Sequence, residues 1–412
     1  VLALNILSEG ITDAMAAPKA AIKPSDSDLN SDREADRLVS DPKLAYKAQA
    51  ASLQARLDQL KTVEMQRKDR FAAHYEVPPV LEVKDLCIKF PRHGDVNVVD
   101  HVSFEVRPRQ TMGLVGESGC GKSITSLTIM GLLDKKAQIS GQILYNGQNL
   151  LDLSDKDMNA LRGHEIAMVY QDALSSLNPS MLIRAQMKQL TKRGGTRTAE
   201  ELLELVGLDP KRTLDSYPHE LSGGQRQRVL IAMALTRDPK LIIADEPTTA
   251  LDVTVQKQVV DLLNKLQKEL GFAMVFVSHD LALVAEVANS ITVMYAGQVV
   301  EQGSVNDILT NPVHEYTRGL LGSVLSIEAG GSANLSGADS ATRLHQIPGS
   351  VPSPKDFPEG DRFTPRSSHP DKVSPVRPVL KTIPGTHHCY AELPAEELKR
   401  LGIEPYPAGG AE

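Results

Sequence analysis

The stretch that most constrains the fold is a glycine-rich loop between a short apolar run and a helix-favouring segment. It reads GESGCGKS, from Gly116 to Ser123, and fits the pattern G-x-x-x-x-G-K-S. Its glycines let backbone N–H groups turn inward around phosphate oxygens, and the following helix adds its positive N-terminal dipole. Lys122 is expected to reach the β- and γ-phosphates of a nucleotide, and Ser123 to place its hydroxyl on Mg²⁺. A chance glycine-rich turn is the alternative, which the strand and helix on either side argue against.

Cys120 lies inside this loop and allows two interpretations. A redox switch is one, because a helix N-terminus lowers the pKa of a thiol. A small residue that fits the turn is the other, and we favour it because nothing else nearby indicates redox chemistry. The residues predicted to contact nucleotide in this stretch are Gly116, Glu117, Ser118, Gly119, Cys120, Gly121, Lys122, Ser123 and Ile124.

Two acidic residues end a second apolar run, LIIADE, further along the chain. Asp245 suits a residue that holds Mg²⁺ through its water shell. Glu246 then stands where a carboxylate could polarise an attacking water molecule. Solvated loop residues are the alternative, which the upstream phosphate-binding loop weakens.

Short β-rich or apolar runs alternate with helix-forming runs from Val80 onward. Strands that alternate with helices predict an α/β fold with a parallel core sheet, and continuous apolar runs are typical of its buried strands. The expected strands lie at 80–90, 98–106, 110–116, 139–150, 241–245, 273–280 and 290–303, and the clearest helices at 123–133 and 253–271.

Composition limits the classes of protein to which the chain can belong. Its 412 residues are more than a domain with a single hydrophobic core usually contains, so two or more structural units are expected. The net charge of −7 argues against a general nucleic-acid surface. Cys87, Cys120 and Cys389 are far apart, which favours a reducing compartment over a disulfide framework. No run of about 18 apolar residues is present, so the sequence predicts no membrane span.

The stretch LSGGQRQRVLIAMAL, Leu221 to Leu235, narrows the class of nucleotide-binding protein. LSGGQ resembles the signature motif of the ATP-binding-cassette (ABC) ATPases. The resemblance implies a P-loop NTPase fold with a RecA-like core, an antiparallel β subdomain and a helical subdomain at about 172–224. In this family the signature motif reaches the γ-phosphate bound to the opposite subunit, so that two ATP molecules are sandwiched in a head-to-tail dimer. The residues that would do so here are Ser222, Gly223, Gly224 and Gln225.

The other elements of the family follow in order over about residues 80–320. By resemblance, Gln171 is the Q-loop glutamine that senses the γ-phosphate, and His279 is the switch histidine. Asp252 ends TTALD, which resembles the D-loop, and Phe90 stands where an aromatic ring stacks on adenine. The resemblance implies ATP hydrolysis by in-line attack of water with Glu246 as the base. The implied catalytic residues are Glu246, His279 and Gln171, the metal-binding residues Ser123, Gln171 and Asp245, and the further nucleotide-binding residues Phe90 and Asp252.

Three segments resemble one branch of this family, the ATPases of dipeptide and oligopeptide importers. They are QDALSSLNPSM, GSVNDILTNPVHEYTRGLLGSV and IPGSVPSPKDFPEGDRFTPR, of which the last resembles the C-terminal extension of that branch. The resemblance implies an ATPase, with ATP and Mg²⁺ as cofactors, that powers peptide uptake. An importer for nickel or another small solute is one alternative, and a non-transport ABC ATPase acting as a regulatory or mechanical module is another.

The same resemblance implies partners and a location. The partners would be a second ABC ATPase subunit, identical or homologous, two permease subunits and an extracytoplasmic solute-binding protein. No nucleic acid is expected among them. The location would be the cytoplasmic face of the cell membrane, where the chain would be peripheral, or tethered if it is fused to a permease.

The chain before the cassette predicts three further features. Residues 1–17 resemble the end of a permease subunit, which is consistent either with a permease–ATPase fusion or with an unrelated helix. Over 18–77 an acidic linker is expected at 18–42 and a helix at 43–76, where Leu53, Leu57 and Leu60 give the helix an apolar stripe. The ATPase domain is expected at 78–322.

An irregular, proline-rich extension is expected at 323–412. Relatives often carry four cysteines here that ligate an iron–sulfur cluster, and thiolates are the usual ligands of such clusters. In this chain Asp361, Ser367 and Ser374 stand near three of those positions, and Cys389 alone remains, so no iron–sulfur cluster is predicted. The adjacent His387, His388 and Cys389 lack the spaced ligand pairs of a zinc site, and a structural role is favoured over metal binding.

Overall fold

The computed structural model describes residues 42–249, 251–332, 347 and 349–407. The chain divides into two units, Val1–Ala55 and Arg56–Glu412, of which the second contains the motifs identified in the sequence. The permease-like segment at 1–17 and the acidic linker that follows it lie outside the described residues.

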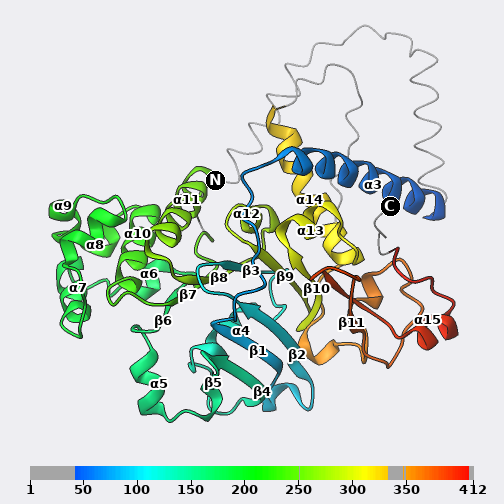
Figure 1. Cartoon of the computed structure of the whole chain (residues 1–412), viewed down its shortest axis with the longest axis horizontal. Coiled ribbons are helices and arrows are strands. Elements are labelled where there is room, and N and C mark those ends of the chain that lie inside the picture. Colours follow the sequence, from blue (N-terminus) through cyan, green and yellow to red (C-terminus); the bar gives the residue numbers. More distant parts are fainter. Residues whose placement is uncertain (1–41, 250, 333–346, 348, 408–412) are drawn as a thin grey trace, which may run out of the picture. The chain divides into compact units, whose positions relative to one another are not determined.

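An eight-stranded sheet forms the centre of the second unit, in the order β11-β12-β10-β9-β3-β8-β7-β6 (Figure 1). The strands from β9 to β6 are parallel, whereas β10, β12 and β11 extend the sheet in antiparallel fashion. This confirms the predicted α/β fold. The strands are β3 (Thr111–Val115), β6 (Ile166–Val169), β7 (Leu241–Asp245), β8 (Ala273–Ser278), β9 (Ser290–Tyr295), β10 (Gln298–Ser304), β11 (Val379–Thr382) and β12 (Cys389–Glu392).

Both faces of this sheet are covered, which explains why its strands are apolar throughout. Every residue of β7 and of β8 is buried. Along β3, Met112 and Leu114 join the core that faces a second sheet, whereas Gly113 faces a helix on the other side. A Cβ atom at Gly113 would lie 2.1 Å from Cγ1 of Val284, so that helix packs closely only because glycine stands here.

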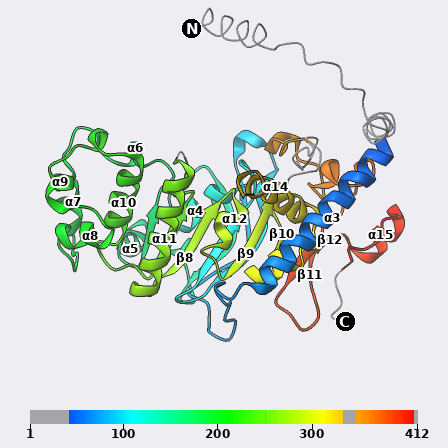
Figure 2. The ribbon, with the colours of Figure 1, turned by 90° about the horizontal axis from the view of Figure 1, so that it is seen from above.

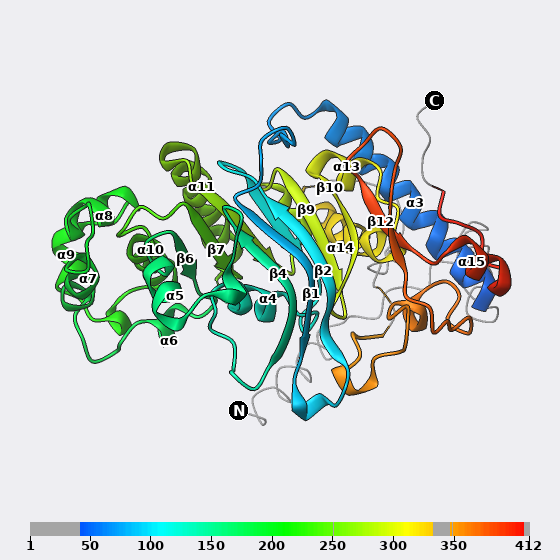
Figure 3. The ribbon, with the colours of Figure 1, turned by 60° about the horizontal axis from the view of Figure 1, so that its bottom comes forward.

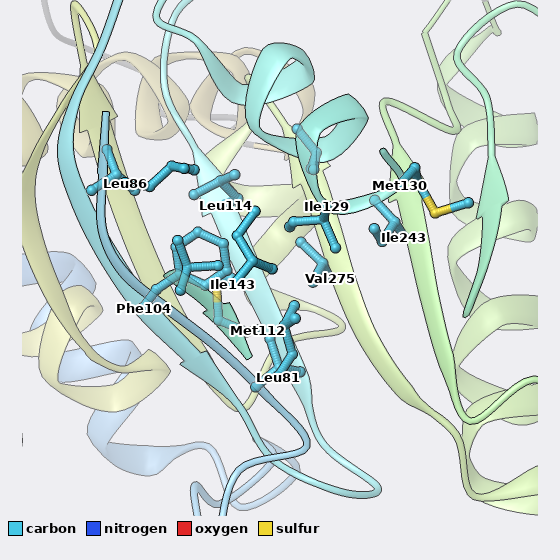
Figure 4. Close-up of a cluster of buried hydrophobic side chains, with 14 of the residues drawn as sticks. Leu81, Leu86, Phe104, Met112, Leu114, Ile129, Met130, Ile143, Ile243 and Val275 are labelled. Carbon is cyan, nitrogen blue, oxygen red and sulfur yellow. The ribbon is translucent and has the colours of Figure 1, made fainter. Parts of the chain in front are cut away.

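The second sheet is antiparallel, in the order β2-β1-β4-β5, as expected for the antiparallel β subdomain (Figure 3). Its strands are β1 (Leu81–Lys89), β2 (Asn97–Val106), β4 (Gln138–Tyr145) and β5 (Gln148–Asn149). Side chains of both sheets and of the helix after β3 form one buried cluster (Figure 4). Its members include Leu81, Leu86, Phe104 and Ile143 from the smaller sheet, Met112, Leu114, Ile243 and Val275 from the larger sheet, and Ile129.

The helices cover the sheets and extend the unit beyond the β6 edge of the larger sheet, where α7, α8 and α9 lie (Figure 3). Helices α6 to α9 lie within residues 172–224, where the sequence predicts a helical subdomain, whereas α10 lies mostly beyond that range. The helices are α4 (Lys122–Ile129), α5 (Asp155–Leu161), α6 (Ala173–Ser176), α7 (Ile183–Thr191), α8 (Ala199–Leu205), α9 (Pro210–Leu214), α10 (Gly223–Ala234), α11 (Val253–Leu270), α12 (Leu281–Ala285), α13 (Val305–Thr310), α14 (Glu315–Ser332) and α15 (Ala395–Leu401). None of the described helices combines the length and the apolar character needed to cross a bilayer.

The helix before the cassette is shorter than the sequence indicates. Helix α3 (Pro42–Gln66) ends well before residue 76, although Leu57 is buried as expected. The segment that follows is held by side-chain bonds to the cassette instead of by its own helical bonds. Asn289 donates to the carbonyl of Ala72, and Gln110 exchanges two hydrogen bonds with the backbone of His74.

The C-terminal extension is more regular than its proline content indicates. Strand β12 pairs with β10 and with β11, so the extension adds two strands to the edge of the main sheet (Figure 2). Each of these strands has only four residues, and their periodicity is too short to read from the sequence. Their pairing depends on β10, which stands far earlier in the chain.

Candidate functional site

The phosphate-binding loop joins β3 to α4, in the context that the motif requires. Gly119 and Gly121 have φ values of 85° and 97°, a left-handed backbone that glycine adopts without strain. Lys122 Nζ donates to the carbonyl oxygens of Gly116 at 2.7 Å and of Glu117 at 3.1 Å. The Lys122 side chain is buried, so its charge is held inside the loop that would surround the phosphates.

Other predicted residues of the loop have distinct surroundings. Ser118 and Gly119 are exposed, whereas Ile124 packs against the core cluster. Glu117 bonds to two residues far along the chain: its N–H donates to the hydroxyl of Tyr316 at 2.8 Å, and its carboxylate pairs with Arg366 at 2.6 Å. Glu117 is a nucleotide contact by its place in the motif, and neither of these partners is apparent from the sequence.

Ser123 and Asp245 come together where a cation would sit beside the loop. Ser123 Oγ donates to Oδ1 of Asp245 at 3.1 Å. Burial raises the pKa of the Asp245 carboxyl above its usual value, because the charged form lacks water around it. A hydroxyl and a carboxylate are the oxygen ligands that suit Mg²⁺, so these two residues fit the predicted ion.

Glu246 forms the centre of a polar network directly after β7. Its Oε2 lies 3.4 Å from Nδ1 of His279, accepts from Nε2 of Gln171 at 3.4 Å and accepts from Oγ1 of Thr249 at 2.7 Å. Lys122 Nζ is 3.8 Å from its Oε1. The contact with His279 foremost, together with those with Thr249 and Lys122, lowers the pKa of Glu246 to about 2 although burial opposes it, so the group is a carboxylate at neutral pH.

The network brings together the three predicted catalytic residues, Glu246, His279 and Gln171. It also contains Thr249, a residue of TTALD that was not among the predicted site residues. Its position three residues after Glu246 was the signal available in the sequence. The N–H of Thr249 donates to the carbonyl of Glu246, and this turn brings the Thr249 hydroxyl back to the Glu246 carboxylate.

The signature residues lie at the start of α10, as expected. Ser222 is the N-cap, whose hydroxyl accepts from the N–H of Gln225, while the Gln225 side chain accepts from the N–H of Ser222. A Cβ atom at Gly224 would lie 2.6 Å from Cγ1 of Val255 on α11, so glycine permits close packing there. Asp252 caps α11 by accepting from the N–H of Val255.

Phe90, predicted to stack on adenine, has its ring covered by other residues of the chain. It is 7% exposed and belongs to the core cluster. The guanidinium carbon of Arg92 lies 5.0 Å from the ring centroid, a cation–π distance. Its stacking on adenine stays a prediction.

Cys120 is fully buried within the loop. Burial raises the pKa of its thiol, which is the opposite of the change that activates a cysteine. This supports the interpretation of Cys120 as a small residue that fits the turn.

The positions aligned with cluster-binding cysteines each have their own local partner. Asp361 accepts from the N–H of Phe363 and from the Thr364 hydroxyl, and Ser367 donates to the carbonyl of Thr364. Ser374 donates to Glu397, whereas Cys389 lies on β12 beside Gln302.

The adjacent residues His387, His388 and Cys389 also have separate partners. His387 stacks on Tyr75 with ring centroids 3.8 Å apart, and His388 Nε2 lies 2.7 Å from Oε1 of the buried Glu301. The two imidazoles therefore serve separate contacts, which supports the structural role favoured from the sequence.

One other group could be considered as a metal site in the part of the chain that the structure describes. Ligand atoms of Cys87, Asp100 and His101 lie within 4.8 Å of one another. However, the Asp100 carboxylate accepts a hydrogen bond from Asn97 at 2.7 Å and lies 3.4 Å from Nε of Arg377. A neighbouring guanidinium already compensates the charge that a cation would need, so we assign no metal here.

The loop, the acidic pair after β7 and the capped signature helix define a P-loop ATPase of the cassette type. Residues 99–249 match the family model described as ABC transporter, and residues 300–372 match that of the oligopeptide/dipeptide transporter C-terminal region. The solved structure of cbiO1 from Clostridium perfringens, part of the ABC transporter complex cbiONQ, is similar at 26% identity. That similarity covers 57% of this chain and 91% of cbiO1, with a TM-score of 0.50.

Curated relatives extend the similarity over nearly their whole length. The oligopeptide transport ATP-binding protein OppD of Bacillus subtilis is 43% identical over 76% of this chain and 88% of its own. OppD of Escherichia coli is 40% identical over 79% of this chain and 96% of its own length. The dipeptide transport ATP-binding protein DppD of Lactococcus lactis is 44% identical over 70% of this chain and 83% of its own length. The chain therefore belongs to the family of ABC transporter ATP-binding proteins.

Proposed function

We propose that this chain powers the uptake of di- or oligopeptides by hydrolysing ATP. The observation that carries the proposal is the match of residues 300–372 to the oligopeptide/dipeptide transporter C-terminal region, beside a complete set of ATPase motifs. Relatives at 40–44% identity are named for oligopeptide or dipeptide transport, which supports the same class of solute.

The chain's own residues can be assigned roles in hydrolysis. The loop N–H groups and Lys122 hold the β- and γ-phosphates, and Ser123, Gln171 and Asp245 would hold a Mg²⁺ ion, which would supply positive charge beside them. Glu246 is ionised and orients the attacking water, from which it accepts a proton. His279 and Gln171 contact the Glu246 carboxylate, which holds it in place and couples it to the γ-phosphate they are proposed to sense.

The proposed assembly follows from the position of the signature residues. The N-terminus of α10 offers backbone N–H groups and the Ser222 hydroxyl to an anion. We assign that anion to the γ-phosphate of ATP on a second ATPase subunit, identical or homologous. Two permease subunits at the cytoplasmic membrane face and an extracytoplasmic solute-binding protein complete the importer.

Glu246→Gln tests the catalytic assignment. Loss of the carboxylate is expected to lower ATP turnover by at least about 100-fold, because the attacking water loses its base. ATP binding should persist, since Lys122 and the loop are unchanged. The measurements are phosphate release and equilibrium binding of ATP, with exposed Glu200 on α8 changed to Gln as the control. Full turnover in Glu246→Gln would contradict the assignment.

Purification of the chain with its native complex tests the transport class. Permease subunits in the complex support import, whereas ribosomes or DNA would support the non-transport alternative. Proteoliposomes holding the complex and its solute-binding protein should then accumulate labelled peptide only with ATP inside. Accumulation of nickel but no peptide would favour the small-solute alternative.

A further inference from the structure

We propose that Arg366, in the C-terminal extension, is a positioning residue for the phosphate-binding loop, so that affinity for ATP depends on the docked extension. Arg366 acts through Glu117, the second residue of the loop. The proposal rests on the proposed role of this loop in nucleotide binding. It gives the extension a function in this chain that needs no cofactor.

The contact between the two residues has the geometry of a specific ion pair. Nη1 of Arg366 lies 2.6 Å from Oε2 of Glu117, and Nη2 lies 3.2 Å from Oε1. Two parallel N–H···O bonds of this kind fix orientation as well as distance. The Arg366 side chain is 5% exposed and that of Glu117 is 33% exposed, so water screens the pair only from one side.

The same guanidinium also holds the extension. Nη2 of Arg366 donates to the carbonyl oxygens of Ile347 at 3.3 Å and Gly349 at 3.2 Å. Its central carbon lies 5.6 Å from the centroid of the Tyr295 ring. Arg366 thus joins the start of the described extension, the end of β9 and the phosphate loop, and it cannot keep all three contacts if the extension moves away.

An aromatic frame fixes the position of this guanidinium. Tyr295 contacts Tyr316 with ring centroids 4.8 Å apart and Phe363 with centroids 5.2 Å apart. Tyr316 and Phe363 are both buried. Tyr316 belongs to α14, and its hydroxyl accepts a hydrogen bond from the N–H of Glu117. The aromatic residues are therefore bonded to the phosphate loop directly as well as through Arg366.

The consequence for nucleotide binding is electrostatic and geometric. Glu117 places a negative charge in a loop that must receive a polyphosphate, and an unpaired carboxylate there would repel the ligand. Arg366 compensates that charge and holds the carboxylate in one direction. Lys122 Nζ bonds to the carbonyls of Gly116 and Glu117, so movement of Glu117 would also displace the lysine that binds phosphate. A loop held in its binding conformation loses less entropy when the ligand arrives.

The test compares the full-length chain with Arg366→Gln, Glu117→Gln and the double variant. The probe is the non-hydrolysable analogue AMP-PNP with Mg²⁺, and its Kd is measured by calorimetry. Arg366→Gln is expected to raise Kd about tenfold, within the usual range for coupled sites. In the Glu117→Gln background the same change should raise Kd less than about twofold, because Arg366 acts through Glu117. Steady-state assays should show a raised KM for ATP and a nearly unchanged kcat.

His388→Gln is the matched control for loosening of the extension. His388 also joins the extension to the cassette through a buried contact with Glu301 on β10, but it has no contact with the loop among the bonds described. We expect His388→Gln to lower the thermal unfolding temperature while Kd for AMP-PNP changes less than about twofold.

Reciprocity supplies a second readout, because a ligand whose affinity depends on the docked extension must also stabilise it. AMP-PNP should slow hydrogen exchange at the amides of Arg366 and Ser367, which donate to Phe363 and Thr364, and the slowing should vanish in Arg366→Gln. The proposal is overturned if Arg366→Gln binds AMP-PNP as tightly as the unchanged chain. It is equally overturned if Arg366→Gln and His388→Gln weaken binding alike, since the role would then be general stability. Failure of the unchanged chain to bind AMP-PNP would instead refute the proposed function.

Discussion

Glu246 shows how one residue can gather groups that stand far apart in the chain. Its backbone leaves β7 with φ of 45°, a left-handed conformation that is uncommon outside glycine, and its N–H donates to the carbonyl of Val277 on β8. This turn points its carboxylate at Gln171, Thr249 and His279. A strained residue that carries the central carboxylate of a site fits a catalytic role.

The ion pair at Glu246 predicts a change in the titration of His279. The carboxylate favours the imidazolium, so it raises the pKa of His279 above the usual value. Removal of that charge in Glu246→Gln should therefore shift the His279 titration midpoint to lower pH. The measurement is an NMR titration of the imidazole, assigned by loss of the signal in His279→Gln. Glu200→Gln is the control, and an unmoved midpoint in Glu246→Gln would contradict the ion pair.

At the scale of elements, β10 joins the cassette to its extension through one buried carboxylate. Glu301 is fully buried and accepts from the N–H groups of Val313 and His314, while its Oε1 lies 2.7 Å from Nε2 of His388. The carboxylate thus bonds both to the backbone just before α14 and to the side chain of the residue that directly precedes β12. This is why two four-residue strands can hold the edge of the sheet.

Glu301→Ala should destabilise the chain by about 3–5 kcal/mol, because it leaves two buried N–H groups and a buried imidazole without their partner. The measurement is urea unfolding followed by circular dichroism. Lys135→Ala is the control: Lys135 pairs with Asp155, but both side chains are more than 80% exposed, at 88% and 82%. Its cost should stay below about 1 kcal/mol. Equal costs for the two variants would contradict the structural role of Glu301.

At the scale of the whole molecule, the phosphate loop and the signature helix belong to different layers of the cassette. The loop follows β3 in the central sheet, whereas α10 packs against β6, α6 and α8. In the proposed function, the phosphate loop of one subunit and the signature helix of the second subunit bind the same ATP molecule. Assembly is therefore expected to depend on ATP.

Ser222→Ala tests that dependence in the Glu246→Gln background, where ATP is retained. The Ser222 variant should lose ATP-dependent association, measured by light scattering with Mg·ATP. Thr198→Ala is the control, because Thr198 caps α8 by the same capping box, and loss of either cap costs about 1 kcal/mol. If both variants associate equally well, the signature residue does not contact the second subunit's ATP. If the Glu246→Gln chain stays monomeric without a further change, both variants are instead mixed with the homologous ATPase of the purified complex, and their association with it is compared.

Much of the fold could be predicted because its signals are local. Continuous apolar runs marked the buried strands β3, β7 and β8, and GESGCGKS lay between a strand and a helix as its chemistry requires. The short strands β6, β11 and β12 were not predicted, since four residues carry too little periodicity. The non-helical segment after α3 was not predicted, because its backbone bonds to Gln110 and Asn289, which lie far along the chain in the cassette.

By itself, the sequence determined the α/β class, the phosphate loop and the acidic pair at Asp245 and Glu246, because each depends on neighbours in the chain. Only the tertiary structure decided that Thr249 bonds to Glu246 and that Phe90 is covered by Arg92. It alone also decided that Arg366 holds Glu117 from 249 residues away. The physical reason is that a hydrogen bond or an ion pair requires atoms within a few ångströms, and only the folded chain sets which distant residues meet that condition.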